Sequence, residues 1–452
     1  MTTIPVDYEI LRLVWWLLLG LLLIGFAIMD GFDLGVAMLL PYVARGDIER
    51  RVTINAIGPF WEGNQVWLIL GGGAVFAAWP PVYATSFSGF YIAMFLVLAT
   101  LILRPVGFEF RNKVADTRWR TFWDYALFAG GLVPSVVFGV AFGNLLQGVP
   151  FRIDSDLRSL YEGSGLFELL NPFGLLCGLV SAAMLATHGA VYLTLKTDGP
   201  VRQRAQEFVK IGAALTVILF ALAGLWVWLG IEGYAITSAV MGDGPSNPLM
   251  KTVVRQPGRW LANYAAHPWM IVAPSLGIFG PLLALLFTMA QRGGLAFIAS
   301  ALGILGIIAT AGLSMFPFLM PSNIAPMVSL TVWDASSSQL TLFVMLLATL
   351  IFLPVVLVYT SIVFSALRGA VTASQVERNL RREQVVLYLD SGSRLRMCLR
   401  HPQCCMARAS SAGRDDRRLE LTFDGAVRAV APGRNQRAGP IHMPSETGTT
   451  AC

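Results

Sequence analysis

Apolar segments of about 20 residues recur along this chain, and they constrain its fold more than any other feature. A helix needs about 20 such residues to cross the hydrocarbon core of a bilayer. Lipid offers no partner for unpaired backbone groups, so the spanning segments are expected to be helical. Composition agrees, because 55% of the 452 residues are hydrophobic and only 13% are charged, against about 25% in soluble domains. The sequence therefore predicts an all-α, polytopic membrane protein.

Nine transmembrane helices are predicted, and turn-forming residues separate several of them. The first apolar run has no small-residue cleavage site and further spans follow it, so it predicts a membrane helix and not a cleaved signal. The predicted breaks are Trp79-Pro80-Pro81, Arg104-Pro105, Gly148-Val149-Pro150, Asn171-Pro172 and Met320-Pro321. The helices are expected at about residues 12–40, 62–79, 84–103, 122–143, 168–193, 210–230, 269–290, 295–316 and 337–366.

Basic residues are divided unevenly between the two sets of predicted loops, which indicates an orientation. If the polar segment that begins at Trp61 spans the membrane, 13 Lys and Arg lie on one side and 5 on the other. The richer side is expected to be cytoplasmic, so the N-terminus is predicted outside and the C-terminus in the cytoplasm. The formal charge of +6 arises from Arg368 onward, because 19 basic and 19 acidic residues balance before it. No basic stripe with interleaved aromatic residues indicates a nucleic-acid partner.

Three carboxylates lie within or at the start of predicted spans, where ionisable groups are costly and often functional. Asp30 and Asp33 are spaced i, i+3, which places both on one face of a helix. Glu62 opens the second helix and is followed by Asn64 and Gln65. Neighbouring carboxylates in a low-dielectric environment can bind and release a proton near neutral pH, so these residues are candidates for a proton path. The alternative is structural, above all for Asp30, which could cap or hydrogen-bond a neighbouring helix.

Histidines and cysteines give no persuasive cofactor site in the membrane part of the chain. His188 and His267 are predicted near opposite faces of the bilayer, too far apart to bind one heme. Methionines in apolar helices are interpreted as packing residues, and Cys177 is isolated in this part of the sequence. No cluster of metal-binding residues is predicted.

Tryptophans and a long loop mark the predicted ends of the helices. Most tryptophans lie near these ends, which predicts an interfacial aromatic belt; Trp61 and Trp67 bracket Glu62 and could instead pack against a partner. The loop at about 231–268 is rich in Gly, Pro and polar residues and is expected to order against the helix ends. Before the last helix, Asp334 or a following serine is predicted to be the N-cap, with Gln339 just inside.

Several motifs follow one another in order and with consistent spacing from about Tyr8 to Asn379. They are Gly31–Gly35, Trp61–Trp67, Phe87–Tyr91, Arg104–Phe108, Gly143–Phe151, Met315–Phe318 and Trp333–Leu342. Together they resemble the second subunit of cytochrome bd-type quinol oxidases. Glu62 stands where some members of that family have an aspartate, which changes the reach of the carboxylate.

The resemblance implies a multi-pass subunit of a complex in the bacterial cytoplasmic membrane that oxidises quinol and reduces oxygen to water. It implies that a heme-bearing subunit I carries hemes b and d, that this subunit supports assembly, and that some members hold a structural quinone here. A small single-helix subunit is a further partner to consider. The implied proton path uses Asp33 and Glu62, and Trp67 matches a residue beside an oxygen route. Two alternatives remain open: a proton-coupled secondary transporter, and a purely structural subunit.

The last part of the chain, 380–452, departs from the resemblance. It is rich in arginine, shows no sustained helical or strand period, and contains Cys398, Cys404, Cys405 and Cys452. We interpret it as a disordered tail or as the product of a frameshift or missed stop. A basic tail that binds anionic lipid is the functional alternative. A zinc site at Cys398, His401, Cys404 and Cys405 has four ligands but no recognised spacing.

Overall fold

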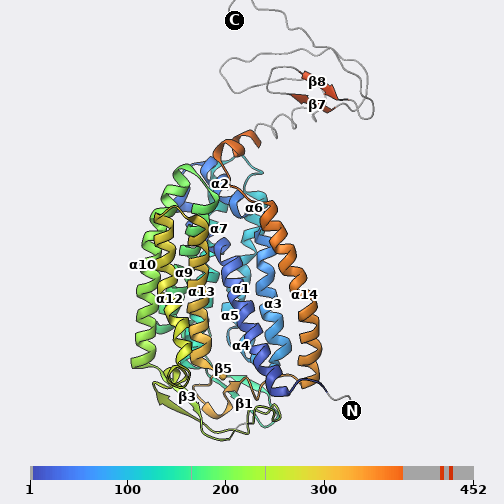
Figure 1. Ribbon diagram of the computed structural model, residues 1–452, viewed down its shortest axis with the longest axis vertical. Coiled ribbons are helices and arrows are strands. Elements are labelled where there is room, and N and C mark those ends of the chain that lie inside the picture. The colour runs from blue at the N-terminus through green and yellow to red at the C-terminus, as the bar shows by residue number, and fades with distance from the viewer. Residues whose placement is uncertain (1–3, 164, 240, 380–417, 422–426, 431–452) are drawn as a thin grey trace, which may run out of the picture. The chain divides into compact units, whose positions relative to one another are not determined.

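The computed structural model describes residues 4–163, 165–239, 241–379, 418–421 and 427–430. Up to Ala373 the described chain forms one bundle of helices with short hairpins at one end (Figure 1), which confirms the all-α polytopic fold. The α-helices are α1 (Tyr8–Val43), α2 (Asp47–Ile57), α3 (Trp61–Ala78), α4 (Pro80–Gly89), α5 (Tyr91–Leu101), α6 (Leu103–Phe110), α7 (Thr117–Gln147), α8 (Leu166–Leu169), α9 (Pro172–Lys196), α10 (Gly199–Gly230), α11 (Ala262–Ala266), α12 (Val272–Met289), α13 (Gly293–Met315) and α14 (Gln339–Ala366).

Three antiparallel strand pairs and three 3-10 turns complete the bundle. The strands pair β1 with β2, β3 with β4 and β5 with β6. They are β1 (Phe151–Ile153), β2 (Ser159–Tyr161), β3 (Glu232–Ile236), β4 (Val253–Pro257), β5 (Phe318–Met320) and β6 (Leu330–Thr331), and the turns are η1 (Arg259–Leu261), η2 (Pro268–Ile271) and η3 (Pro326–Val328). We call the end of the bundle that carries the strands the hairpin end, and the opposite one the α2 end.

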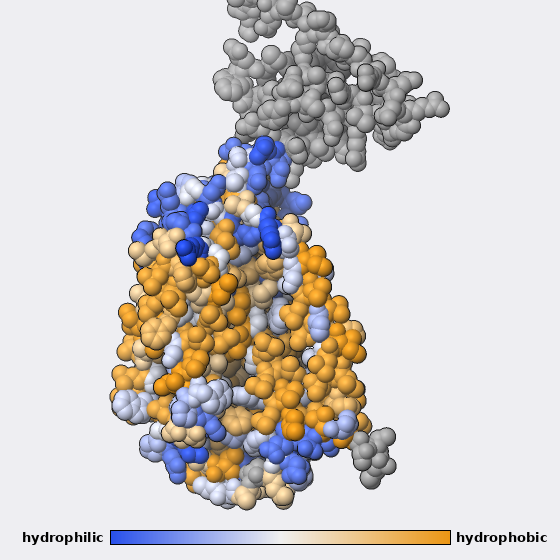
Figure 2. All heavy atoms as spheres, in the orientation of Figure 1, coloured by the Kyte–Doolittle hydropathy of each residue, from blue (hydrophilic) through white to orange (hydrophobic). Residues whose placement is uncertain are grey.

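Within the described residues, eight helical segments are long and apolar enough to cross a membrane. Figure 2 shows the corresponding hydrophobic band between two hydrophilic ends. The predicted second span, α3, is not among the eight, because its first turn carries polar residues, yet it runs beside α1 in the bundle (Figure 1). The eight segments are Tyr8–Val43, Tyr91–Phe110, Thr117–Gln147, Pro172–Lys196, Gly199–Gly230, Pro268–Met289, Gly293–Met315 and Gln339–Ala366. Nine spans and the membrane orientation remain predictions.

The predicted break at Arg104-Pro105 is wrong. Both residues lie inside α6, where Pro105 occupies the first turn, and proline needs no hydrogen-bond donor there. The helix expected at 84–103 is instead divided into α4, α5 and α6. The break at Asn171 is confirmed, since the Asn171 side chain accepts a hydrogen bond from the Gly174 amide at 2.8 Å as the N-cap of α9.

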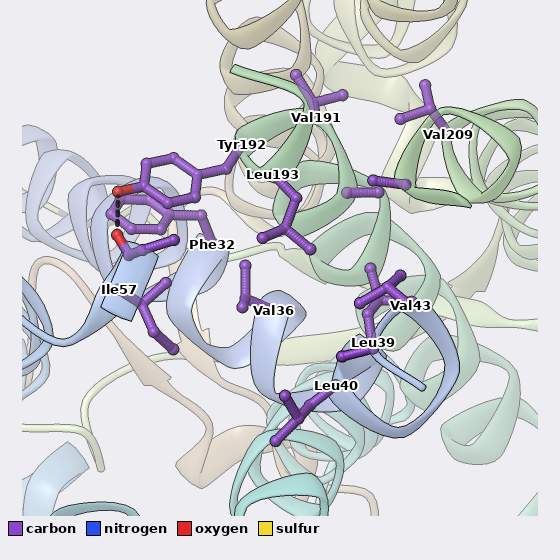
Figure 3. Close-up of a cluster of buried hydrophobic side chains, with 14 of the residues drawn as sticks. Phe32, Val36, Leu39, Leu40, Val43, Ile57, Val191, Tyr192, Leu193 and Val209 are labelled. Carbon is purple, nitrogen blue, oxygen red and sulfur yellow. Dashed lines mark hydrogen bonds between the residues drawn. The ribbon is translucent and has the colours of Figure 1, made fainter. Parts of the chain in front are cut away.

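Helix α1 lies at the centre of the bundle and crosses α9 at two glycines. A methyl group added to Gly35 would collide with the Leu185 carbonyl oxygen, and one added to Gly189 would lie 2.5 Å from the Gly35 carbonyl carbon. Small residues at such a crossing allow two backbones to touch. Beside it, Phe32 stacks on Tyr192 with ring centroids 4.1 Å apart, and the Tyr192 hydroxyl donates to the Ala56 carbonyl at 2.8 Å (Figure 3).

At the α2 end, carboxylates on α2 and α7 bind arginines from several helices. Asp124 accepts from Arg50 at 2.6 Å and from Arg111 at 2.6 Å. Glu49 pairs with Arg204 of α10 at 2.7 Å, and the hydrogen bond from Arg204 outweighs partial burial to hold the pKa of Glu49 below its usual value. These contacts fix α2 against α7 and α10.

At the hairpin end, the long loop is ordered against the helix ends, as predicted. Lys251 of this loop pairs with Asp334 at 2.7 Å in a buried site. Burial lowers the pKa of Lys251, although the Asp334 carboxylate partly opposes this effect. Asp334 does not cap α14; the following Ser338 is the N-cap, as the alternative prediction had it, and accepts from the Thr341 amide at 3.3 Å.

The predicted aromatic belt is only partly correct. Trp226, Trp228 and Trp269 are exposed at the surface, as an interfacial belt requires. Trp15, Trp79 and Trp123 are instead buried, because the helix ends are covered by loops and neighbouring helices.

In the unit from Ser374 to Cys452, strands β7 (Arg418–Leu421) and β8 (Val427–Val430) form an antiparallel pair. This pair was not expected from the sequence. The cysteines of the tail and His401 lie outside the described residues, so the zinc alternative and the origin of the tail stay predictions.

Candidate functional site

The first part of the candidate site is an ion pair buried in the bundle. Helix α1 carries Asp30 and α6 carries Arg104, and neither side chain has exposed area. The two terminal nitrogens of Arg104 donate to the two carboxylate oxygens of Asp30 at 2.7 and 3.0 Å. This bidentate geometry is the strong form of an arginine–carboxylate contact. Asp30 therefore has its charge compensated and both oxygens occupied.

Asp33, one turn further along α1, is equally buried but only half satisfied. The Asn64 side-chain amide of α3 donates to Asp33 Oδ2 at 2.8 Å. Among the described residues, neither Asp33 Oδ1 nor the buried Arg104 Nε has a hydrogen-bond partner. A buried acceptor without a partner costs about 1–3 kcal/mol, so Asp33 has an oxygen free to form a further bond, whereas both oxygens of Asp30 are occupied.

The other sequence-predicted residues of this region lie on α3, on two different faces. Trp67 is buried in the chain's own core, where a methyl group on Gly25 would lie 2.7 Å from its ring. It therefore packs against α1, and the expected packing against a partner is wrong for this residue. Glu62 is exposed on the opposite face of the helix from Asn64. The structure thus joins Asp33 to Asn64 and leaves Glu62 on the surface.

Sequence reasoning missed the role of Arg104, which was counted with the loop residues. A signal was present, because Arg104 directly follows an apolar run. An arginine at that depth requires an acidic partner. Asp30 was the available carboxylate in an apolar helix, but spacing within one sequence does not reveal which helices are neighbours.

The two histidines of the membrane part of the chain have different surroundings. Both ring nitrogens of His188 are engaged, one with Ser300 Oγ at 2.7 Å and one with the Ile28 carbonyl at 3.0 Å. His267 is exposed and follows α11 at the hairpin end. The described residues contain no group of three or more His, Cys, Asp or Glu placed to bind a metal. Both ring nitrogens of His188 are thus engaged within the chain, and the absence of a heme site from this subunit stays a prediction.

An apolar cavity of about 730 Å³ lies between α1, α7, α9, α10, α12 and α13. Its wall is aromatic and aliphatic, with residues such as Phe26, Phe138 and Phe220. Its lining includes the hydroxyl residues Ser181, Thr310, Tyr264 and Ser314, and the hydroxyls of Tyr264 and Ser314 lie 3.0 Å apart. The volume and lining suit a largely apolar ligand with one polar group.

The outer face of α3 carries a carboxylate, a glycine and large apolar residues. Gly73 lies about three turns after Glu62 on the same face, and a methyl group added to Gly73 would meet nothing within 4 Å. Ile69 and Phe76 are exposed on this side of the helix as well. A carboxylate avoids lipid and a glycine allows close helix packing in membranes, so this face is suited to another protein helix.

Comparison with known proteins gives a family assignment. Residues 11–367 match the family described as cytochrome bd terminal oxidase subunit II. The chain belongs to this family. It is 52% identical over 374 residues to the cytochrome bd-I ubiquinol oxidase subunit 2 of Escherichia coli K12, covering 83% of this chain and 98% of that protein. The Bacillus subtilis cytochrome bd ubiquinol oxidase subunit 2 is 33% identical over 344 residues, covering 76% and 91% of the two chains.

A solved structure supports the fold. The bd oxidase from Geobacillus thermodenitrificans contains a chain that superposes with a TM-score of 0.58 at 15% identity, covering 78% of this chain and 97% of that one. Membership of the family makes this chain a multi-pass inner-membrane subunit of an oxidoreductase complex that contains hemes and a subunit I. The assignment does not favour the transporter alternative.

Proposed function

We propose that this subunit II supports quinol oxidation and oxygen reduction by its complex in two ways: it stabilises the heme-bearing subunit I, and it conducts protons from the cytoplasm. The observation that carries the proton role is the half-satisfied Asp33, buried beside an ion pair that is already complete. Ionisable groups buried within membrane helices are typical of functional sites.

The two carboxylates of α1 have different roles in this proposal. Asp30 is fixed by Arg104 through two hydrogen bonds and serves as a structural group. Asp33 has one unoccupied oxygen and carries the proton. Of the candidate residues Asp33, Glu62 and Asp30, the first is thus the carrier, and Asp30 stabilises the arginine next to it.

Glu62 is proposed to receive protons at the surface of α3 where the partner subunit docks. Its exposed side chain lies on the same face of α3 as Gly73, which has open space around it. A helix of subunit I packed on this face would remove Glu62 from lipid and place it in a protein-lined path. Trp67, buried behind this face, keeps its proposed place beside an oxygen route.

The cofactors are proposed to divide between the subunits. Hemes b and d belong to subunit I, since the His188 nitrogens are occupied within this chain. The apolar cavity would hold the structural quinone, with its phenylalanines, Tyr264 and Ser314 among the residues that would contact it. A ubiquinol substrate is proposed by analogy with the relatives' names.

The proton role is tested in the assembled complex reconstituted into vesicles. Asp33→Asn and Glu62→Gln should each reduce oxygen consumption and proton uptake, the former by about tenfold or more. Glu109→Gln is the matched control. Glu109 is an exposed carboxylate of α6, at the α2 end of the bundle, where the helix that carries Glu62 also begins. It should behave like the unmodified complex. If Asp33→Asn and Glu62→Gln both keep normal turnover and uptake, the purely structural alternative holds.

A further inference from the structure

The side of α3 that faces the bundle positions one polar residue against α1. Its buried residues are spaced at three and four positions, so they form a single stripe. These are Asn64, Trp67, Gly71, Ala74 and Ala78. Asn64 is 2% exposed, and it is the polar member of a stripe that is otherwise apolar or glycine.

The contact of Trp67 with α1 fixes the position of this stripe along the axis of α1. Its ring occupies the space that a side chain at position 25 would need, since a methyl group on Gly25 would lie 2.7 Å from two ring carbons. Asn64 lies one turn before Trp67 on the same face. The contact of Trp67 with Gly25 therefore places the Asn64 amide opposite Asp33, to which it donates at 2.8 Å.

Neighbouring polar and charged groups form their hydrogen bonds with residues other than Asp33. Arg104 donates through both terminal nitrogens to Asp30, on the same helix as Asp33, and its Nε has no partner in the described part of the chain. On α9, the Tyr192 hydroxyl donates to the Ala56 carbonyl, and His188 is held by Ser300 and Ile28 as described above. Within the described part of the chain, Asn64 is thus the side chain that donates a hydrogen bond to Asp33.

We propose that Asn64 is a positioning residue that keeps Asp33 Oδ2 as a permanent acceptor and leaves Oδ1 as the atom that takes up and releases the proton. This inference rests on the proposed role of Asp33 as the carrier. An asparagine amide donates at any physiological pH, so its hydrogen bond persists in both states of the carboxyl group. On loading, an O–H bond forms at Oδ1 as the O–H bond of the donor breaks, and on release the same exchange runs in reverse, with no redox change.

The geometry has a vibrational signature. When Oδ1 holds the proton, Oδ2 is the carbonyl oxygen, and its stretching frequency is lowered by the hydrogen bond from Asn64. Infrared difference spectra of the whole complex between its oxidised and reduced states would record this band, and Asp33→Asn would identify it by removing it. In Asn64→Leu, which is similar in size but cannot donate, the band should move to higher frequency. Gln65→Leu removes the neighbouring amide of α3 and should leave the band in place.

A second variant tests the same inference if the Asn64→Leu complex fails to assemble. Gly25→Ala displaces Trp67 and with it α3, so it should move the same band in the same direction without altering either Asn64 or Asp33. A band that stays in place in both variants would overturn the positioning role. Normal turnover and proton uptake in Asp33→Asn, or the absence of any Asp33 band, would instead overturn the carrier role on which the inference rests.

Discussion

The buried ion pair between Asp30 and Arg104 should be strongly destabilised when only one partner is removed. Arg104→Met replaces the guanidinium by an apolar chain and leaves the Asp30 carboxylate in a site with no exposed area. Two charge-assisted hydrogen bonds of 2.7 and 3.0 Å are lost. Two unit charges about 4 Å apart attract by about 4 kcal/mol at an effective dielectric constant near 20. Removing one partner of a buried pair costs about 3–5 kcal/mol in measured cases, and the two estimates agree.

The assay is thermal unfolding of the purified complex in mild detergent. The measured quantity is the fraction of the complex that remains monodisperse after heating. Arg104→Met should lower the stability by an amount that corresponds to more than about a hundredfold in the unfolding equilibrium. Asp30→Leu combined with Arg104→Met should recover most of this loss, because apolar replacement of a whole pair is often close to neutral. Arg118→Met changes an exposed arginine of α7 and should alter stability by less than about 0.5 kcal/mol. The reasoning fails if the single and double variants unfold alike, or if Arg104→Met unfolds like the unmodified complex.

Two further predictions concern the α2 end and the centre of the bundle. The pKa of Glu49 is lowered in the folded chain. Its pair with Arg204 therefore stabilises the folded state at pH values above the unfolded-state pKa of about 4.3. This stabilisation is lost as the pH falls through the folded-state pKa. Glu49→Gln should flatten that part of the stability–pH curve by at most about 1 kcal/mol, as unfolding measured from pH 7 downward would show; an unchanged curve would contradict the assignment. Gly35→Ala should destabilise by about 1–3 kcal/mol through its collision with Leu185, while Gly20→Ala, with open space around it, should not; equal unfolding temperatures would contradict the crossing geometry.

The sequence predicted helices correctly where the length of an apolar run determines the helix. It was less accurate where packing against other helices determines where a helix begins or which residues meet. The span expected at 210–230 begins instead at Gly199. Its first turns are polar, but Val201, Ala205 and Val209 bury one stripe against the bundle, and a hydropathy pattern alone does not weigh such a stripe. The ion pair of Arg104 with Asp30 was missed for a related reason. Residues 74 positions apart meet only because α6 returns to α1, and no local pattern encodes that return.

Helix α3 shows why the least certain predicted span is also the most informative about function. Its first turn carries Glu62 and Asn64, which lower its apolar character and remove it from the set of evident spans. Asn64 faces inward to Asp33, and Glu62 is exposed on the outer face of the helix, which it shares with Gly73. A helix that needed only to cross lipid would gain nothing from either residue, because both oppose insertion. Their placement on opposite faces is what the proposed proton route requires, since that route enters at the partner's surface and ends at a carboxylate inside the bundle.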